Sequence, residues 1–149
     1  MEKVLISACL LGDNTKYDGK NNYTKEVEKL FGLCDLIIVC PEVMGGLKTP
    51  RAPSEINGKQ IINSKGKDVT SFFNNGANFV SYIASQNNVK YAVFKEKSPS
   101  CGSKKIYDGT FTNRVIDGEG VTSKLLKKQG VTIFNEFEID LLVEILKNN

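Results

Sequence analysis

The amino-acid sequence predicts an α/β fold: a Rossmann-like, three-layer α/β/α architecture with a mostly parallel sheet of about four core strands plus two β-hairpin excursions. Two observations carry this prediction. Short apolar runs typical of buried parallel strands alternate with segments of helical periodicity. Two dipeptides typical of tight turns, Asn57-Gly58 and Asp108-Gly109, interrupt the alternation. At 149 residues, the chain is expected to form a single domain over residues 1–149.

Four apolar runs are the expected core strands, and they cover residues 4–9, 35–40, 91–95 and 131–134. Each run is short, is dominated by aliphatic or aromatic side chains, and precedes a turn or a breaker such as Pro41. A parallel strand is buried on both faces, so it forms a continuous apolar run rather than an alternating one. These runs therefore predict a sheet that is covered on both sides.

Helical periodicity between the runs predicts the covering layers. Apolar residues recur at helical spacing in residues 26–31, 69–84, 121–128 and in a last helix after residue 135. Asp68 is placed to cap the second helix, and Asn135 to cap the last, where Glu138 completes a capping-box-like pattern.

The remaining segments are expected to be hairpins and loops. Asn57-Gly58 would join residues 55–56 to 59–62, and Asp108-Gly109 would join residues 105–107 to 110–112. Residues 41–53 contain two adjacent glycines and Pro50, so this stretch is expected to be an irregular loop.

Composition excludes several classes of function. Without histidine there is no Ser-His-Asp or Cys-His catalysis, no histidine-rich zinc site and no imidazole proton shuttle. The net charge of +3 is too small and too dispersed to predict a stable nucleic-acid complex. No apolar run approaches the ~20 residues of a membrane helix, and the N-terminus lacks the apolar core of a signal peptide. We expect a cytoplasmic protein without a membrane partner, whose cysteines are reduced.

Three of the 4 cysteines fall at the carboxyl ends of predicted strands. Cys9 closes the first strand, Cys40 closes the second, and Cys101 lies just past the third. Ligands of open α/β sheets bind outside the carboxyl ends of the strands. If these strands are parallel neighbours, the three sulfurs converge on one crevice, where thiolates could bind zinc, copper(I) or an iron–sulfur cluster.

Cys34 is a poor fourth ligand, because it lies at the amino end of the second strand, nearly 20 Å from the other end at ~3.3 Å per residue. We expect it to be a buried, inert thiol. Three ligands would suit a centre that the protein coordinates incompletely, such as a cubane cluster with one open iron. The alternative stays open that all four cysteines are core residues, since free cysteines are among the most buried residue types.

At these positions the sequence resembles the thiouracil desulfidase family, and the resemblance covers nearly the whole chain. Single motifs are weak, but their order and joint presence make the match specific. Small departures occur at Lys16 and Glu119, and neither touches the cysteines. The matching segments are Cys9-Leu10-Leu11-Gly12, Tyr17-Asp18-Gly19, Cys40-Pro41-Glu42, Gly45-Gly46-Leu47, Pro50-Arg51, Gly66 to Thr70, Ser98-Pro99-Ser100-Cys101-Gly102, Ile106 to Phe111 and Gly118 to Thr122.

The resemblance implies a [4Fe-4S] cluster held by Cys9, Cys40 and Cys101, with one iron open. The implied reaction removes sulfur from a small thiolated pyrimidine such as 2-thiouracil, giving uracil and hydrosulfide without net redox change. The open iron would polarise the thiocarbonyl group for attack by water. Among the residues present, Glu42 is the candidate base, and Ser98 or Ser100 is the candidate hydrogen-bonding partner.

For other side chains near these motifs, a structural role is expected at least as strongly as a role in binding or catalysis. We expect Arg51 and Glu55 to form an ion pair or to anchor the long loop. Tyr17 and Tyr107 either stack on a flat base or cover the sheet edge. Lysines 95 and 97 are expected to be solvated, and the Asp-Gly pairs at 18–19 and 108–109 to form turns.

Two other functions remain possible from the sequence. One is a structural or regulatory metal-binding α/β domain without catalysis, with zinc as its metal. The other is a ligand-binding module whose cysteines belong to the core. The sequence predicts neither the oligomeric state nor whether the substrate is a free base, a nucleoside or a nucleotide.

Overall fold

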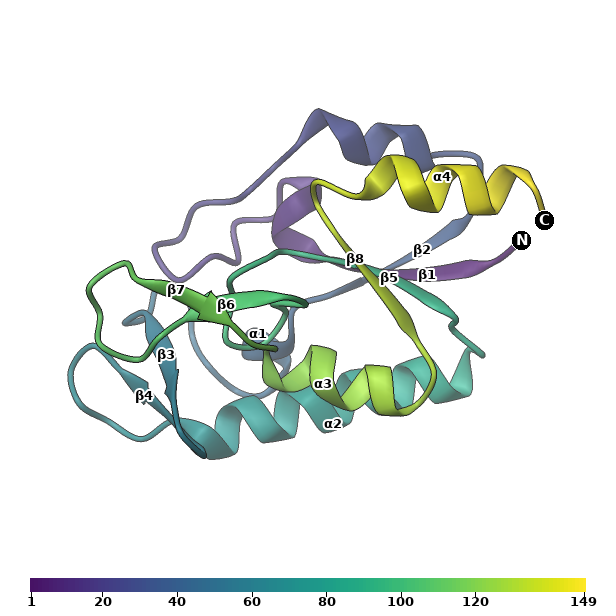
Figure 1. Ribbon diagram of the computed structural model, residues 1–149. Coiled ribbons are helices and arrows are strands. Elements are labelled where there is room, and N and C mark those ends of the chain that lie inside the picture. The colour runs from purple at the N-terminus through teal and green to yellow at the C-terminus, as the bar shows by residue number, and fades with distance from the viewer.

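Parallel strand pairing builds the centre of the molecule in a computed structural model that describes residues 1–149 (Figure 1). The strands lie in the order β2-β1-β5-β8, and every neighbouring pair is parallel. Their bounds are Lys3–Ser7 for β1, Asp35–Val39 for β2, Tyr91–Phe94 for β5 and Thr132–Asn135 for β8. The four predicted core strands are therefore confirmed.

Helices cover both faces of this sheet, which confirms the three-layer architecture (Figure 1). On one face lie the 3-10 helix η2 (Lys25–Leu30) and α4 (Ile139–Lys147). On the other lie α2 (Thr70–Gln86) and α3 (Val121–Lys128). None of the helices combines the length and apolar character that crossing a membrane requires.

Residues of β1 alternate between the two cores, as strand geometry demands. Val4 and Ile6 are fully buried in the core that includes η2 and α4, whereas Leu5 is fully buried in the core that includes α2 and α3. Cys34 packs in the first of these cores, close to the amino end of β2. Because both faces are buried, β1 is held at the middle of the sheet.

The first predicted hairpin is confirmed, with its turn one residue later than expected. β3 (Ser54–Asn57) pairs with β4 (Gln60–Asn63), and Asn57 is the register partner of Gln60. The turn residues are thus Gly58 and Lys59, and Gly58 adopts a left-handed backbone with φ 64°. A glycine at this position accommodates the turn without steric cost.

The second hairpin has a different return strand from the predicted one. β6 (Lys105–Tyr107) pairs with β7 (Val115–Asp117), so residues 108–114 form a loop and residues 110–112 are not a strand. The reason is local and tertiary bonding: Asp108 accepts the backbone N–H of Thr110, and Glu55 accepts the N–H groups of Gly109 and Phe111. The N–H groups of residues 109–111 therefore bond to carboxylates and not to an adjacent strand, as they would in a tight hairpin.

Residues 41–53 were expected to be entirely irregular, but they begin with the short helix α1 (Pro41–Met44). Pro41 occupies its first position, where the missing N–H costs nothing and the fixed φ suits a helix. Cys40 is the N-cap residue, and its carbonyl accepts the N–H of Met44 at 2.9 Å. A similar helical turn, η1 (Ala8–Leu11), follows β1, so Cys9 lies in a 3-10 turn rather than in the strand.

Both predicted caps act just before their helices rather than at the N-cap position. Asp68 accepts the N–H of Thr70 at 2.9 Å, one residue before the N-cap of α2. Asn135 accepts the N–H of Phe137, while its own N–H bonds to the Glu138 carboxylate at 3.0 Å. This reciprocal pair confirms the capping-box-like pattern, but α4 begins only after Glu138.

Helices α1 and α2 approach so closely that glycine is needed on both. A Cβ added to Gly76 would lie 1.9 Å from the Pro41 carbonyl oxygen, and one added to Gly45 would lie 2.0 Å from the Phe72 carbonyl oxygen. Two atoms that are not bonded cannot approach to such distances. The clashing atoms are backbone carbonyl oxygens, which no side-chain rotation can move away. The long helix α2 therefore fixes the turn that follows Cys40.

The loop after β5 is built around the buried carboxylate of Glu96, which is 5% exposed. It accepts backbone N–H groups from Ser103 at 2.6 Å and Lys104 at 3.2 Å, and the side-chain amide of Asn135 at 2.9 Å. Burial alone raises the pKa of Glu96, but the bonds from Asn135, Lys104 and Ser103 outweigh it, and the pKa falls below its ordinary value. The ionised carboxylate thus organises the loop that carries Cys101.

The amino end of α3 holds the same loop from the other side. The Val121 N–H donates to the Pro99 carbonyl and the Thr122 N–H to the Ser100 carbonyl, both at 2.9 Å. The Ser123 hydroxyl donates to the Cys101 carbonyl at 2.7 Å. These contacts satisfy N–H groups that have no partner within the helix, so the cysteine loop is the cap of α3.

Replacing Gly76 with Ala should destabilise the protein, although alanine is the better helix former by about 1 kcal/mol. The clash with the Pro41 carbonyl cannot be relieved by side-chain rotation, so overpacking should cost about 3 kcal/mol. We expect a net loss of about 2 kcal/mol in urea unfolding followed by far-UV circular dichroism. Asn75→Ala, at the neighbouring exposed position, is the matched control and should not lose stability.

Replacing Glu96 with Gln should lower the free energy of unfolding at pH 7 by about 1.5–3 kcal/mol, because an amide would meet several N–H donors. Since the folded pKa is lowered, the contribution of Glu96 is present above about pH 4.5 and is lost as the pH falls through the folded pKa. The stability difference between wild type and variant should therefore shrink on acidification. An exposed control, Glu144→Gln, should show no such difference, and a pH-independent gap at Glu96 would contradict the assignment.

Candidate active site

A cavity of about 450 Å³ opens at the carboxyl ends of β2, β1 and β5. Its wall includes residues that directly follow these strands, together with parts of β3 and of the loop between β6 and β7. The volume is in the range of small-molecule binding sites. The cavity lies where the topology of an open parallel sheet places a ligand.

Three cysteines line this cavity, and the fourth does not. Cys9 comes from η1, Cys40 directly follows β2, and Cys101 lies in the loop after β5. Cys34 is buried in the core, and its Sγ lies 3.7 Å from the Leu30 carbonyl oxygen. All four cysteines are free thiols. Three cysteines thus line the cavity and Cys34 does not, but Cys101 is also buried in the core that contains Leu5, so the division into cavity and core cysteines is not complete.

Burial raises the pKa of three thiols, those of Cys9, Cys34 and Cys101. It raises the pKa of Cys9, and the hydrogen bond to Asn22 opposes that rise only in part. It raises the pKa of Cys101 strongly, despite hydrogen bonds from Ser7 and Ser100. Burial also raises the pKa of Cys34, to about 11. Thiols of this kind lose their protons when a metal binds, so metal binding would release protons.

The arrangement of the three cysteines bears on two kinds of metal centre, a single ion and a cluster. No group of three or more cysteine or acidic side chains is placed around a single point where one metal ion could bind. Cys9, Cys40 and Cys101 line the same cavity, at the carboxyl ends of three neighbouring strands. Thiolates that bind different irons of a cluster need not share one ion, so the three cysteines fit an iron–sulfur cluster.

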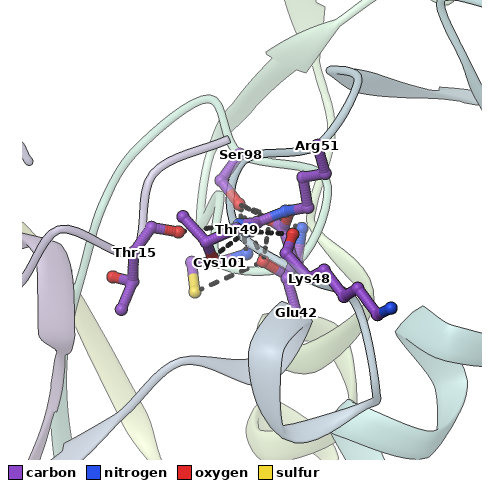
Figure 2. A network of polar contacts seen from close by, with 8 residues as sticks. Thr15, Glu42, Lys48, Thr49, Arg51, Ser98 and Cys101 are labelled. Carbon is purple, nitrogen blue, oxygen red and sulfur yellow. Dashed lines mark hydrogen bonds and ion pairs between the residues drawn. The ribbon is translucent and has the colours of Figure 1, made fainter. Parts of the chain in front are cut away.

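Glu42 and two serines form a polar network next to Cys101 (Figure 2). The Ser100 hydroxyl donates to Glu42 Oε2 at 3.0 Å, and Ser98 Oγ lies 3.5 Å from the same oxygen. The two serine oxygens are 2.8 Å apart. The structure therefore brings all three predicted catalytic side chains together in the cavity wall, together with the sulfur of Cys101.

The direction of these hydrogen bonds follows from the donors around Ser98. Its oxygen accepts the backbone N–H groups of Ser100 and Cys101, each at 3.1 Å, so both of its lone pairs are occupied. The Ser98 proton must then be donated, and Ser100 Oγ is the nearest acceptor. Ser98, Ser100 and Glu42 thus form a chain in which protons point towards the carboxylate.

Arg51 and Glu55 both anchor loops, but they do not pair with each other. Arg51 Nε donates to Glu42 Oε1 at 3.1 Å, and Arg51 Nη2 donates to the Thr15 carbonyl at 2.8 Å (Figure 2). Glu55 holds the loop between β6 and β7 through two backbone N–H groups. No sequence pattern indicated that the partner of Arg51 would be the candidate base Glu42.

Side chains of three further kinds complete the wall. Lys95 is not freely solvated as expected: it is 28% exposed and its Nζ lies 2.8 Å from Glu136 Oε2. Tyr17 and Tyr107 line the cavity, where stacking on a flat ligand remains a prediction. Phe111 also lines it and was not anticipated, because the sequence predicted a strand at that position.

The supporting groups that sequence reasoning missed are Glu96, Ser7 and Asn22. Ser7 accepts the backbone N–H of Lys95 at 3.0 Å and opposes the burial that raises the pKa of Cys101, while the backbone N–H of Asn22 donates to the Cys9 carbonyl at 3.0 Å. Each acts on a residue distant in the sequence, so no local pattern reveals it. Only the position of Ser7 at the carboxyl end of a strand could have drawn attention to it.

Known proteins are similar to this chain in sequence and in fold. Residues 4–138 match the family model described as 2-thiouracil desulfurase. The uncharacterized protein YbbK of Bacillus subtilis (strain 168) is 37% identical over 147 residues, covering 92% of this chain and 97% of that protein. The solved structure of TudS, described as a [4Fe-4S]-dependent thiouracil desulfidase, matches with a TM-score of 0.93 and 37% identity, covering 100% of both chains. The chain therefore belongs to the 2-thiouracil desulfurase family.

Proposed function

We propose that the protein is a [4Fe-4S]-dependent enzyme that removes the sulfur of a small thiolated pyrimidine such as 2-thiouracil. The observation that carries this proposal is the meeting of three thiols and the Glu42–Ser100–Ser98 chain in one cavity. The 37% identity to TudS over the whole chain supports the same chemistry. The products would be uracil and hydrosulfide, with water as the second substrate and no net redox change.

Cys9, Cys40 and Cys101 are the residues that would hold the cluster. When bound through three thiolates, a [4Fe-4S] cluster supplies an open iron that acts as a Lewis acid towards a soft thiocarbonyl sulfur. Because these cysteines follow three neighbouring strands, the sheet itself sets their relative placement. Cys34 would take no part, since it is buried in the core away from the cavity.

Glu42 would take the proton of the attacking water at Oε2, the oxygen that also accepts the Ser100 hydroxyl. Water forms a bond to the ring carbon, the carbon–sulfur bond breaks, and the sulfur leaves as hydrosulfide with one of the water protons. Ser98 and Ser100 would orient Glu42, which would return the first water proton to the departing sulfur and then accept the remaining one. This assignment gives every transferred proton a donor or acceptor among residues of the cavity.

The cavity also bounds the substrate class. A volume of about 450 Å³ accommodates a single heterocycle and leaves room for a sugar or phosphate. With a net charge of +3, the chain is not expected to form a stable nucleic-acid complex. Four free thiols suit a reducing compartment, and we propose that the protein acts in the cytoplasm.

Separate substitutions of Cys9, Cys40 and Cys101 by Ala should abolish the brown colour of the protein purified without oxygen. Each variant should bind little iron and sulfide and release no hydrosulfide from 2-thiouracil, because two thiolates cannot replace three. Cys34→Ala is the matched control and should keep both the cluster and the activity. A fully active Cys101→Ala variant, or a colourless wild type carrying stoichiometric zinc, would rule out the proposed function.

Glu42→Gln should keep its full iron content and lose about 10²–10⁴-fold in kcat, since an amide cannot accept the proton of water. Ser100→Ala should also retain the cluster and lose turnover, because it interrupts the chain from Ser98 to Glu42. The rate of hydrosulfide release measures both effects, with Glu144→Gln as an exposed control. Unchanged turnover in Glu42→Gln would remove Glu42 from the role of base.

A further inference from the structure

We propose that Arg51 is a positioning residue, which fixes one carboxylate oxygen of Glu42 so that the other faces Ser98 and Ser100. This inference rests on the proposed function, because it assigns to Arg51 the orientation of the candidate base. Arg51 itself is not required to touch the substrate.

The two oxygens of Glu42 have separate partners. Oε1 lies 3.1 Å from Arg51 Nε, and Oε2 lies 3.0 Å from the Ser100 hydroxyl. Both side chains are largely withdrawn from water, with 10% of Arg51 and 17% of Glu42 exposed. A carboxylate held at both oxygens cannot rotate, so the guanidinium decides which oxygen is available on the serine side.

The guanidinium is itself immobilised by the loops around it. Nη1 donates to Thr49 Oγ1 at 2.9 Å and to the Lys48 carbonyl at 3.3 Å, and Nη2 donates to the Thr15 carbonyl at 2.8 Å (Figure 2). The backbone N–H of Arg51 bonds to the Tyr17 carbonyl at 2.7 Å. A planar fork with fixed donors suits this role better than the single flexible ammonium of lysine.

These contacts connect segments that follow different strands. Residues 15–17 come after Cys9 and β1, whereas residues 42–51 come after Cys40 and β2. Arg51 therefore ties the two loops together and at the same time contacts the candidate base. A residue of purely structural value would need only the backbone contacts.

The test is a double-mutant cycle of Arg51→Ala and Glu42→Gln, measured as hydrosulfide release from 2-thiouracil by the cluster-loaded protein. Misplacing a catalytic group by about 1 Å costs on the order of 10²-fold. We expect Arg51→Ala to lower kcat by about that factor while KM changes by less than about threefold. In the Glu42→Gln protein, adding Arg51→Ala should lower kcat hardly any further. Arg51→Lys should recover part of the loss.

Two controls separate positioning from folding. Arg114, the other arginine of the chain, is 77% exposed, and Arg114→Ala should leave kcat unchanged. Iron and sulfide content of the Arg51 variants should equal that of the wild type. If Arg51→Ala does not fold, Arg51→Gln keeps a hydrogen-bonding amide at this site without the charge, and the same expectations apply to it.

A crystal structure of the Arg51→Ala protein without cluster provides a readout independent of turnover. The contact of 3.0 Å between Glu42 Oε2 and Ser100 Oγ should be lost. An intact contact, or equal and independent losses in the two backgrounds of the cycle, would overturn the inference. A wild type that releases no hydrosulfide would overturn the proposed function instead, while the crystal structure would still decide whether Arg51 orients Glu42.

Discussion

Parallel pairing of β1 with β2 on one side and β5 on the other is the constraint on which the site depends. Ser7 is the register partner of Val39, so η1 and Cys40 leave the sheet side by side, and the loop after β5 leaves next to them. A shift of the register by one residue would move Leu5 to the opposite face of the sheet, into the core that contains Val4 and Ile6. Because the side chains on both faces are buried, such a shift is unfavourable. Hydrophobic burial therefore fixes the placement of the sulfurs, since Cys101 itself packs in the core that contains Leu5 and Cys9 packs against the core that contains Val4 and Ile6.

Beyond the sheet, backbone contacts rather than side-chain packing hold the segments that line the cavity. The turn of Pro41 rests on Gly76 of α2, and the carbonyls of Pro99 and Ser100 cap α3. Backbone contacts leave little freedom for adjustment, because no rotamer change can relieve a misfit. Glu96 adds an ionised acceptor that its surroundings satisfy fully enough to lower its pKa despite burial. Rigid supports of this kind suit a site whose thiols must stand ready for a cluster.

The sequence predicted the sheet, its covering helices and the placement of three cysteines because each has a local or periodic signature. Apolar runs mark buried strands, and a cysteine at the end of such a run has a predictable position. The departures have long-range causes. The strand expected at residues 110–112 is a loop because Glu55, distant in sequence, binds the N–H groups of Gly109 and Phe111. The pairing of Arg51 with Glu42 depended on the unforeseen helix α1, which turns the Glu42 side chain towards both Arg51 and the serines.

The absence of histidine finally explains why the polar network has this form. A histidine base carries one acceptor nitrogen and one donor, and a single hydrogen bond to the donor selects its orientation. A carboxylate has two equivalent oxygens, so selecting one of them requires a partner on each. Arg51 binds Oε1 and Ser100 binds Oε2, so each oxygen of the candidate base has its own partner. Arg51 and the two serines thus define the orientation of the candidate base Glu42. In an imidazole ring, the difference between the donor and the acceptor nitrogen would define it.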